Sequence, residues 1–361
     1  MGLDETTLRD IGRCVMVGVR GAGPGDDALR RDLDACVEAR CRAIVLFDRD
    51  MPSGGPRNVE SPGQLRDLIA FVRETLGQGT IVAVDQEGGS VQRLRAASGF
   101  VESPSASDFA AMAPDRRTAE ADALARQLGD LGIDLNFAPC ADVAINLESP
   151  IIASRGRTFG SDPEVVIACA VAVRDAHHRA GVSPCVKHFP GHGSARGDSH
   201  RGLPDITDVW DEAVELAPFA ALLKADSPVC CMTAHLLHRV VDAEFPASLS
   251  RAWTTGVLRD RLRFAGVVVT DSLDMRAVAD RFPTGEAAAL AIAAGADLAL
   301  DANNMPGASR VCPATEMASA IARAIEDGRI EREAVANSAR RVDAMAAFSG
   351  RGVRGASPRH V

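Results

Sequence analysis

The chain has 361 residues, enough for two average domains or for one large barrel, and 46% of them are hydrophobic. The net charge of −9, an aromatic share of 4% and the lack of Tyr argue against a nucleic-acid-binding surface. No run of 18 apolar residues occurs, and the polar first ten residues lack the apolar core of a signal peptide. We therefore expect no nucleic-acid partner and no membrane partner, and the composition carries no signal for an oligomeric state.

Short apolar runs alternate along the chain with helical patterns. The runs are apolar on both faces, as buried parallel strands are. They cover residues 12–18, 42–47, 80–84, 133–138, 183–188, 228–234, 265–271 and 297–301. The helical patterns cover residues 26–39, 64–76, 116–131, 163–180, 211–223, 251–262, 285–294 and 314–325. This alternation predicts an α/β chain folded as a single (β/α)8 TIM-type barrel. A doubly wound open sheet is the alternative, but no Gly-x-Gly-x-x-Gly follows the first run.

The C-terminal part of the chain adds one element to this pattern. Residues 331–347 have the periodicity of an extra amphipathic helix, which we expect to pack outside the barrel. The Gly-, Arg- and Ser-rich residues after it resemble a loose tail. We therefore predict one barrel domain over residues 1–348 and a flexible C-terminal tail over residues 349–361.

The nine cysteines do not form a recognisable disulfide pattern. Their number is odd, no Cys-x-x-Cys occurs, and several lie inside apolar strand-like runs. This usage is typical of small buried hydrophobic residues in a reducing compartment. We therefore expect a cytoplasmic protein.

Polar residues stand at the C-terminal ends of six expected strands, the edge that carries the active site in barrels. They are Asp48, Asp85, Asp142, Lys187 with His188, His235 and Asp271. Lys187 is unusual in composition, because only two of the 40 basic residues are Lys and the other 38 are Arg. Lys offers a compact charge with three donors where Arg offers a flat fork.

Residues 186–204 combine three His with several Gly and Pro. Pro190 and Gly191 exclude a helix, so Asp198 and His200 belong to a loop. An imidazole suits proton transfer near neutrality, and a carboxylate two residues away can orient it. A solvent-exposed loop His without a function is the alternative. Asp271, at the end of its strand, could attack an electrophilic carbon or cap the next helix, and spacing alone leaves both open.

A metal site is a further possibility at this loop. His188, His192, Asp198 and His200 form a His-rich cluster. However, Pro190 and Gly191 prevent His188 and His192 from sharing one face of a helix, as zinc-binding His pairs do. We expect no metal and no cofactor.

Four stretches together resemble glycoside hydrolase family 3. They are Lys-His-Phe-Pro-Gly-His-Gly at 187–193 with Asp-Ser-His at 198–200, Asp-Gln-Glu-Gly-Gly at 85–89, Arg-Thr-Phe-Gly at 157–160, and the strand end at Asp271. The similarity runs through residues 10–345 and is greatest to the bacterial β-N-acetylglucosaminidase (β-hexosaminidase) branch.

This resemblance implies a retaining glycoside hydrolase that removes terminal non-reducing β-N-acetylglucosamine. It implies that Asp271 forms a covalent glycosyl intermediate and that His200, oriented by Asp198, is the general acid/base. The implied sugar-binding residues are Asp85, Arg93, Arg157, Lys187 and His188. The family context implies a small carbohydrate or muropeptide substrate, processed during peptidoglycan recycling.

Other functions remain open at this point. The nearest are a phosphorylase and a β-glycosidase of other specificity on the same scaffold. A non-catalytic sugar-binding barrel and a metal-dependent barrel hydrolase are more distant alternatives.

Overall fold

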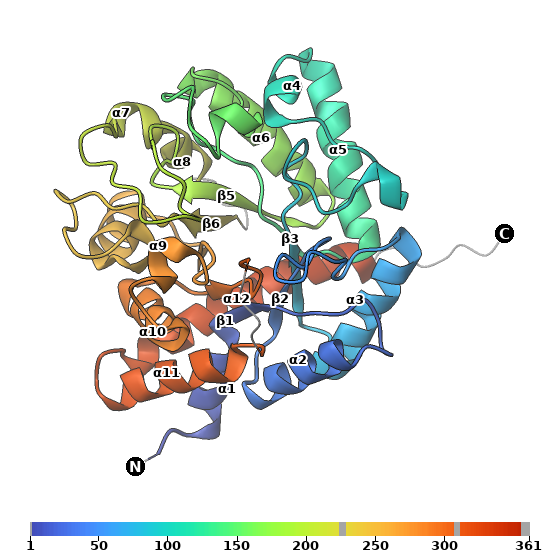
Figure 1. Cartoon of the computed structure of the whole chain (residues 1–361), viewed down its shortest axis with the longest axis vertical. Coiled ribbons are helices and arrows are strands. Elements are labelled where there is room, and N and C mark those ends of the chain that lie inside the picture. The colour runs from blue at the N-terminus through green and yellow to red at the C-terminus, as the bar shows by residue number, and fades with distance from the viewer. Residues whose placement is uncertain (1, 224–228, 307–310, 355–361) are drawn as a thin grey trace.

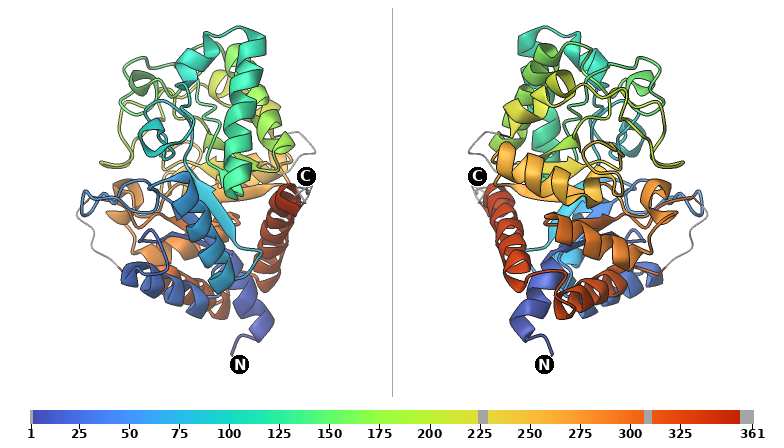
Figure 2. Two further views of the ribbon diagram at one scale, coloured as in Figure 1. Left: turned by 90° about the vertical axis from the view of Figure 1, so that its right-hand side faces the viewer. Right: turned by 90° about the vertical axis from the view of Figure 1, so that its left-hand side faces the viewer.

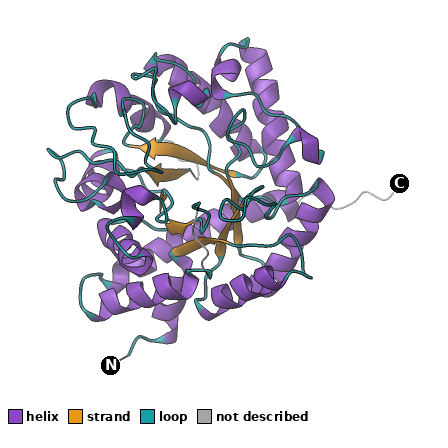
Figure 3. Cartoon of the chain, viewed as in Figure 1, coloured by secondary structure: helices purple, strands orange, loops and turns teal. Residues whose placement is uncertain are grey.

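Eight parallel strands form a nearly closed barrel in the middle of a ring of helices (Figures 1 and 3). The computed structural model describes residues 2–223, 229–306 and 311–354. The strands are β1 Val15–Gly18, β2 Ala43–Leu46, β3 Ile81–Val84, β4 Leu135–Asn136, β5 Ser183–Phe189, β6 Cys230–Thr233, β7 Val267–Thr270 and β8 Ala299–Asp301. Every predicted strand is present, and the prediction of a (β/α)8 barrel is confirmed.

The barrel closes between its last two strands. The hydrogen-bonded order is β7-β6-β5-β4-β3-β2-β1-β8, so β8 pairs with β1 at one end of the sheet. A parallel bridge between Val269 and Leu298 joins β7 to the segment entering β8. All strands point the same way, so their C-terminal ends meet at one face of the barrel.

The strands bury both of their faces, which explains their continuous apolar runs. Val15 and Val17 of β1 belong to the large cluster between the strands and the surrounding helices. Met16, between them, belongs to the cluster inside the barrel, where Cys185 and Cys230 also lie. All nine cysteines are free and buried, as their usage predicted.

The helices surround the strands. They are α1 Glu5–Arg13, α2 Asp27–Glu38, α3 Pro62–Leu76, α4 Ala106–Ala110, α5 Pro114–Leu131, α6 Pro163–Arg179, α7 Glu212–Glu215, α8 Ala217–Leu222, the π-helix η4 Ala252–Arg261, α9 Arg276–Ala279, α10 Thr284–Ala294, α11 Ala314–Glu326 and α12 Arg332–Arg354, with 3-10 turns η1 Ala96–Ser98, η2 Ala153–Arg155 and η3 Ala247–Leu249. The helix predicted over 211–223 is divided into α7 and α8, with Pro218 in the first turn of α8. The short α1, α4 and α9 were not predicted, because so few residues carry little periodicity.

Helix α12 lies across the end of the barrel at which the strands begin, and its side chains reach the cluster inside the barrel, which refines the prediction that it packs outside (Figure 2). Val342 and Met345 join the cluster inside the barrel. The Ser349 hydroxyl donates to the carbonyl oxygen of Asp134, just before β4, over 2.9 Å. The helix continues to Arg354, beyond the predicted start of the tail at 349, and residues 355–361 of that tail lie outside the described residues.

Within the ranges that the structure describes, no helix is both long and apolar enough to cross a membrane.

Candidate active site

The structure brings all eight predicted site residues to the C-terminal face of the barrel. Asp85 follows β3, Lys187 and His188 lie near the C-terminal end of β5, and Asp271 follows β7. Arg93 and Arg157 lie on the loops after β3 and β4, and Asp198 and His200 lie on the loop after β5. The peptide bonds Lys187–His188 and Phe189–Pro190 are cis.

Lys187 stands between two carboxylates. Its Nζ lies 2.7 Å from Asp85 Oδ1 and 2.7 Å from Glu87 Oε1, and its side chain is only 2% exposed. Arg93 Nη2 lies 3.3 Å from the other oxygen of Asp85. Burial would raise the pKa of Asp85, but Lys187 and Arg93 lower it below its usual value. Asp85 is therefore an ionised acceptor that retains partial exposure, as binding sugar hydroxyls requires.

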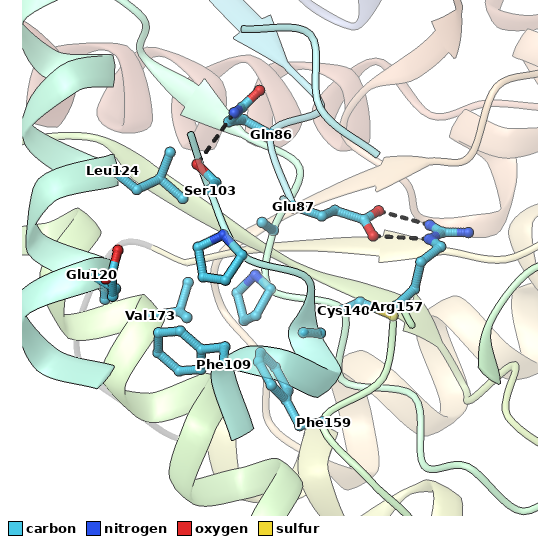
Figure 4. Close-up of a pocket in the computed structure, with 15 residues that line it drawn as sticks. Gln86, Glu87, Ser103, Phe109, Glu120, Leu124, Cys140, Arg157, Phe159 and Val173 are labelled. Atoms are coloured by element: carbon cyan, nitrogen blue, oxygen red, sulfur yellow. Dashed lines mark hydrogen bonds and ion pairs between the residues drawn. The ribbon is translucent and has the colours of Figure 1, made fainter. Parts of the chain in front are cut away.

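Glu87 and Arg157 form a two-pronged ion pair (Figure 4). Arg157 donates from Nε to Oε2 over 2.8 Å and from Nη2 to Oε1 over 2.7 Å. Despite burial, Arg157 and Lys187 hold the pKa of Glu87 well below its usual range. The guanidinium predicted to bind the sugar thus faces a protein carboxylate. This ion pair fixes the orientation of the guanidinium, and its contact with a sugar stays a prediction.

His188 is fixed by a carboxylate to which the sequence prediction gave no site role, Asp142. His188 Nδ1 lies 2.6 Å from Asp142 Oδ2, and His188 Nε2 lies 3.2 Å from Arg157 Nη2. Because Arg157 can only donate, Nε2 accepts and Nδ1 carries the proton. Burial opposes ionisation of Asp142, but His188 holds its pKa well below the usual range. The only sequence signal for Asp142 was its place after a strand.

Asp198 and His200 form a dyad at the tip of the loop. His200 Nδ1 lies 2.9 Å from Asp198 Oδ1, which also accepts the backbone N–H of His200 over 2.9 Å. The imidazole is 52% exposed, whereas the carboxylate is 16% exposed. The carbonyl of Ser199 accepts the N–H of Ala277 in α9 over 3.2 Å. The dyad is therefore docked against the segment that follows Asp271.

Asp271 lies among three imidazoles. Burial would raise the pKa of its carboxyl, but His235, His188 and His200 lower it. Oδ1 accepts the N–H of Ser272 over 2.8 Å. The cap of the next helix, α9, is Met275, so the helix-capping alternative for Asp271 is wrong. What remains is a partly buried, ionised carboxylate held at a strand end.

A cavity of about 40 Å³ lies beside the Glu87–Arg157 ion pair, and it is not the sugar site. Its wall is largely apolar, from side chains of Phe109, Leu124, Phe159 and Val173, and Glu87 and Arg157 border it (Figure 4). Ligand pockets usually measure about 300–1,000 Å³. This cavity is too small for a sugar ring.

Among the described residues, one group has the ligand types for a metal ion, and it differs from the cluster weighed in the sequence. Atoms of Cys140, Asp142 and His188 lie within 4.8 Å of one another. The thiol of Cys140 donates to Asp142 Oδ2 over 3.1 Å, and His188 Nδ1 is 2.6 Å from the same oxygen. These are hydrogen-bond distances, and a tetrahedral zinc would separate such ligands to roughly 3.3 Å.

We expect that metal removal leaves catalysis unchanged, because protons already join the three potential ligands. Overnight dialysis against a strong chelator should leave kcat and KM at their initial values. The control is the same dialysis without chelator. A reversible loss of activity that zinc restores would contradict this expectation and revive the metal-dependent alternative.

A barrel that gathers carboxylates, imidazoles and basic groups at the C-terminal ends of its strands has the architecture of a barrel enzyme. A partly buried strand-end carboxylate near a more exposed proton-transfer group suits glycosidic-bond cleavage. Residues 33–345 match the model of the glycosyl hydrolase family 3 N-terminal domain, and the chain belongs to this family.

Curated relatives and solved structures agree with this membership. The chain is 39% identical over 272 residues to a β-hexosaminidase of Tolumonas auensis, covering 73% of this chain and 76% of the relative. It is 35% identical over 308 residues to a β-hexosaminidase of Methylococcus capsulatus, covering 84% and 83%. A family 3 β-N-acetylglucosaminidase from Paenibacillus sp. superposes with a TM-score of 0.86 at 30% identity, over 100% of this chain and 65% of that one. A β-N-acetylhexosaminidase from Beutenbergia cavernae superposes with a TM-score of 0.83 at 28% identity, over 95% and 99%.

Replacing Asp85 and replacing Arg157 should have different effects on activity and stability. Asp85→Ala should lower kcat/KM by about 10- to 150-fold, because one charged hydrogen bond to a ligand is worth about 1.5–3 kcal/mol. The melting temperature of Asp85→Ala should change little, because Lys187 stays paired with Glu87. Arg157→Ala should instead destabilise the fold, because Glu87, only 5% exposed, loses its two hydrogen bonds to Arg157; the loss should stay below the roughly 3–5 kcal/mol of a fully unpaired buried charge, since Lys187 remains 2.7 Å from Glu87.

Steady-state kinetics and thermal unfolding of both variants measure this difference. If Asp85→Ala keeps the wild-type kcat/KM, Asp85 does not contact the substrate.

Proposed function

We propose that the chain is a β-N-acetylhexosaminidase that releases terminal β-N-acetylglucosamine from the non-reducing end of its substrate, with retention of configuration. The observation that carries the proposal is the position of Asp271, an ionised carboxylate with His188, His200 and His235 close enough to lower its pKa. A rigid carboxylate that stays ionised can form a bond to the anomeric carbon. The curated relatives named β-hexosaminidase support the specificity.

In the first step an Asp271 carboxylate oxygen attacks the anomeric carbon, and the bond to the leaving oxygen breaks as His200 gives that oxygen a proton. In the second step the neutral His200 takes a proton from water, and the water oxygen replaces Asp271 on the anomeric carbon. Asp198 accepts a hydrogen bond from His200 Nδ1 over 2.9 Å, which leaves His200 Nε2 for both proton transfers. An imidazole thus occupies the role that a second carboxylate has in most glycosidases.

The sugar is held on the other side of the site by groups from three strands. Asp85 supplies a partly exposed carboxylate, and Lys187 and Arg93 keep it ionised. His188, held by Asp142, presents a ring of fixed orientation. Groups held this rigidly favour binding of a distorted sugar near the transition state.

A panel of nitrophenyl glycosides with purified protein tests the activity. Turnover should be largest with the β-N-acetylglucosaminide. Preference for another β-sugar would favour a different β-glycosidase, and no turnover of any member would favour a sugar-binding barrel. Product analysis with inorganic phosphate present separates hydrolysis from phosphorolysis, because a neutral imidazole does not repel an incoming anion as a carboxylate would.

We also infer that the natural substrate is a cell-wall muropeptide processed in the cytoplasm, in peptidoglycan recycling. Nine free, buried thiols support a reducing compartment. Exposed arginines on the loop that carries the dyad, Arg196 and Arg201, are suited to the carboxylates of a peptide-bearing aglycone. Comparing a disaccharide with the same disaccharide bearing a peptide tests this specificity.

A further inference from the structure

The loop that carries Asp198 and His200 rests at its root on Glu215, the last residue of α7, which the mechanism does not use. Glu215 is fully buried. Its Oε2 accepts the backbone N–H of Gly193 over 2.9 Å and that of Ser194 over 3.2 Å. A Cβ added to Gly191 would lie 2.7 Å from Glu215 Cβ, so the loop passes directly over this side chain.

The start of the loop, residues 191–194, is packed tightly against the barrel, and the part near Ser199 is held by a separate contact. A Cβ on Gly193 would lie 1.6 Å from the carbonyl oxygen of Val143, which leaves no room between the root and the segment after β4. Trp210 Nε1 donates to the carbonyl of Pro190 over 3.2 Å. The tip is docked through Ser199 on Ala277. The position of the dyad therefore depends on where residues 191–194 are anchored.

Holding the loop with Glu215 lowers the stability of the fold. Its Oε1 has no hydrogen-bond partner in the described part of the chain, nor does either ring nitrogen of the neighbouring His192. No cation is paired with Glu215 among the described residues. A buried carboxylate without a cation costs stability, so its presence calls for a reason other than stability.

We propose that Glu215 is a positioning residue of this enzyme, which holds the root of the 191–204 loop so that Asp198 and His200 reach the leaving group. This inference rests on the proposed acid/base role of His200. Glu215 touches no reacting atom and acts only through the loop. A carboxylate is suited to this task because two backbone N–H groups converge on one ionised oxygen.

The charge of Glu215 should make this function depend on pH. Burial raises the pKa of Glu215 to about 7, although hydrogen bonds from Ser194 and Gly193 oppose the rise and Asp142 adds to it. The titratable groups around it are Asp142, from the segment after β4, and His192, from the loop itself. Burial lowers the pKa of His192 to about 4, so this ring is neutral in the range where Glu215 titrates.

The kinetic test uses Glu215→Gln, which resembles the protonated side chain, with Glu212→Gln as the matched control. Glu212 lies on the same short helix but is exposed and pairs with Arg261 at the surface. With a disaccharide substrate, kcat of Glu215→Gln should match the wild type at pH 5 and fall about tenfold or more below it at pH 8. With a nitrophenyl glycoside the loss in the glycosylation step should be much smaller, because that leaving group needs no proton. Glu212→Gln should behave as the wild type throughout.

As pH rises, the stability of Glu215→Gln relative to wild type should increase while its relative activity falls. The folded pKa of about 7 lies above the usual value of 4.5, so folding favours the protonated form. The stabilisation from protonation is complete below about pH 4.5 and is lost as pH rises through about 7. Gln never ionises, so the melting temperature of Glu215→Gln relative to wild type should rise between pH 5 and pH 8. A merely structural carboxylate would give a less stable variant at both values, which would overturn the inference.

A double-mutant cycle with His200→Ala separates this inference from the function on which it rests. If Glu215 acts through the dyad, adding Glu215→Gln to His200→Ala should cause little further loss on the disaccharide. A full additional loss would overturn the positioning role. If His200→Ala itself affects both leaving groups equally, the proposed acid/base assignment fails. If His200→Ala shows the leaving-group effect and Glu215→Gln does not, only the inference about Glu215 fails.

Discussion

Asp271→Asn should reduce turnover of every glycoside by at least about 10⁴-fold, since removing the nucleophile abolishes the covalent route. Asn has nearly the same shape and can still accept the N–H of Ser272, so the fold should persist. The folded carboxylate has a lowered pKa, so it stabilises the fold above its usual pKa and this stabilisation is lost on acidification. A modest decrease in melting temperature at pH 7 should therefore accompany the kinetic loss.

Trapping the intermediate identifies the nucleophile directly. A fluorosugar inactivator should add its mass to the peptide that contains Asp271 and to no other peptide. Asp280→Asn is the control, because Asp280 is an exposed carboxylate that pairs with Arg276 in the next helix. That variant should be labelled and turn over substrate as the wild type does. A label on another residue of an active enzyme would contradict the assignment of Asp271.

His200→Ala should impair substrates in proportion to their need for a proton. General acid catalysis contributes about 10²- to 10⁴-fold, so cleavage of a disaccharide should fall by that factor. Formation of the glycosyl intermediate from a nitrophenyl glycoside should be far less affected, because nitrophenolate leaves without help. Asp198→Ala should show a weaker form of the same pattern, since the imidazole remains but loses its 2.9 Å contact.

The measurement is pre-steady-state and steady-state kinetics on both substrates for wild type and the two variants. Arg196→Ala is the control for the loop, because Arg196 is an exposed residue of the same loop. It should keep both activities towards these uncharged substrates. An equal loss on both substrates in His200→Ala would mean that His200 shapes the site and does not transfer the proton.

The catalytic face was predictable because it depends on local features. An apolar run followed by a carboxylate or an imidazole marks a strand end, and parallel strands gather those ends on one face. Asp85, His188 and Asp271 were placed there by this reasoning alone, and the fold confirms the placement. The roles of these residues came from the resemblance to family 3 and remain predictions.

The partners of these residues were not predictable from spacing. Lys187 meets Asp85 across 102 positions, Arg157 meets Glu87 across 70, and His188 meets Asp142 across 46. Each contact forms only when β3, β4 and β5 pair in register and direct the side chains to the same point. Glu215 carried no signal at all, since a Glu in a short helical pattern is ordinary.

By itself, the sequence determined the number and order of the strands, the face that carries chemistry and the loop that carries the dyad. These properties follow from apolar periodicity and from Gly and Pro, which act over a few residues. Only the tertiary structure decided that α12 closes the barrel, that Arg157 faces Glu87 and that Glu215 anchors the loop. Closing the barrel brings distant segments together, and burial then decides which charges must be paired and which proton each group keeps.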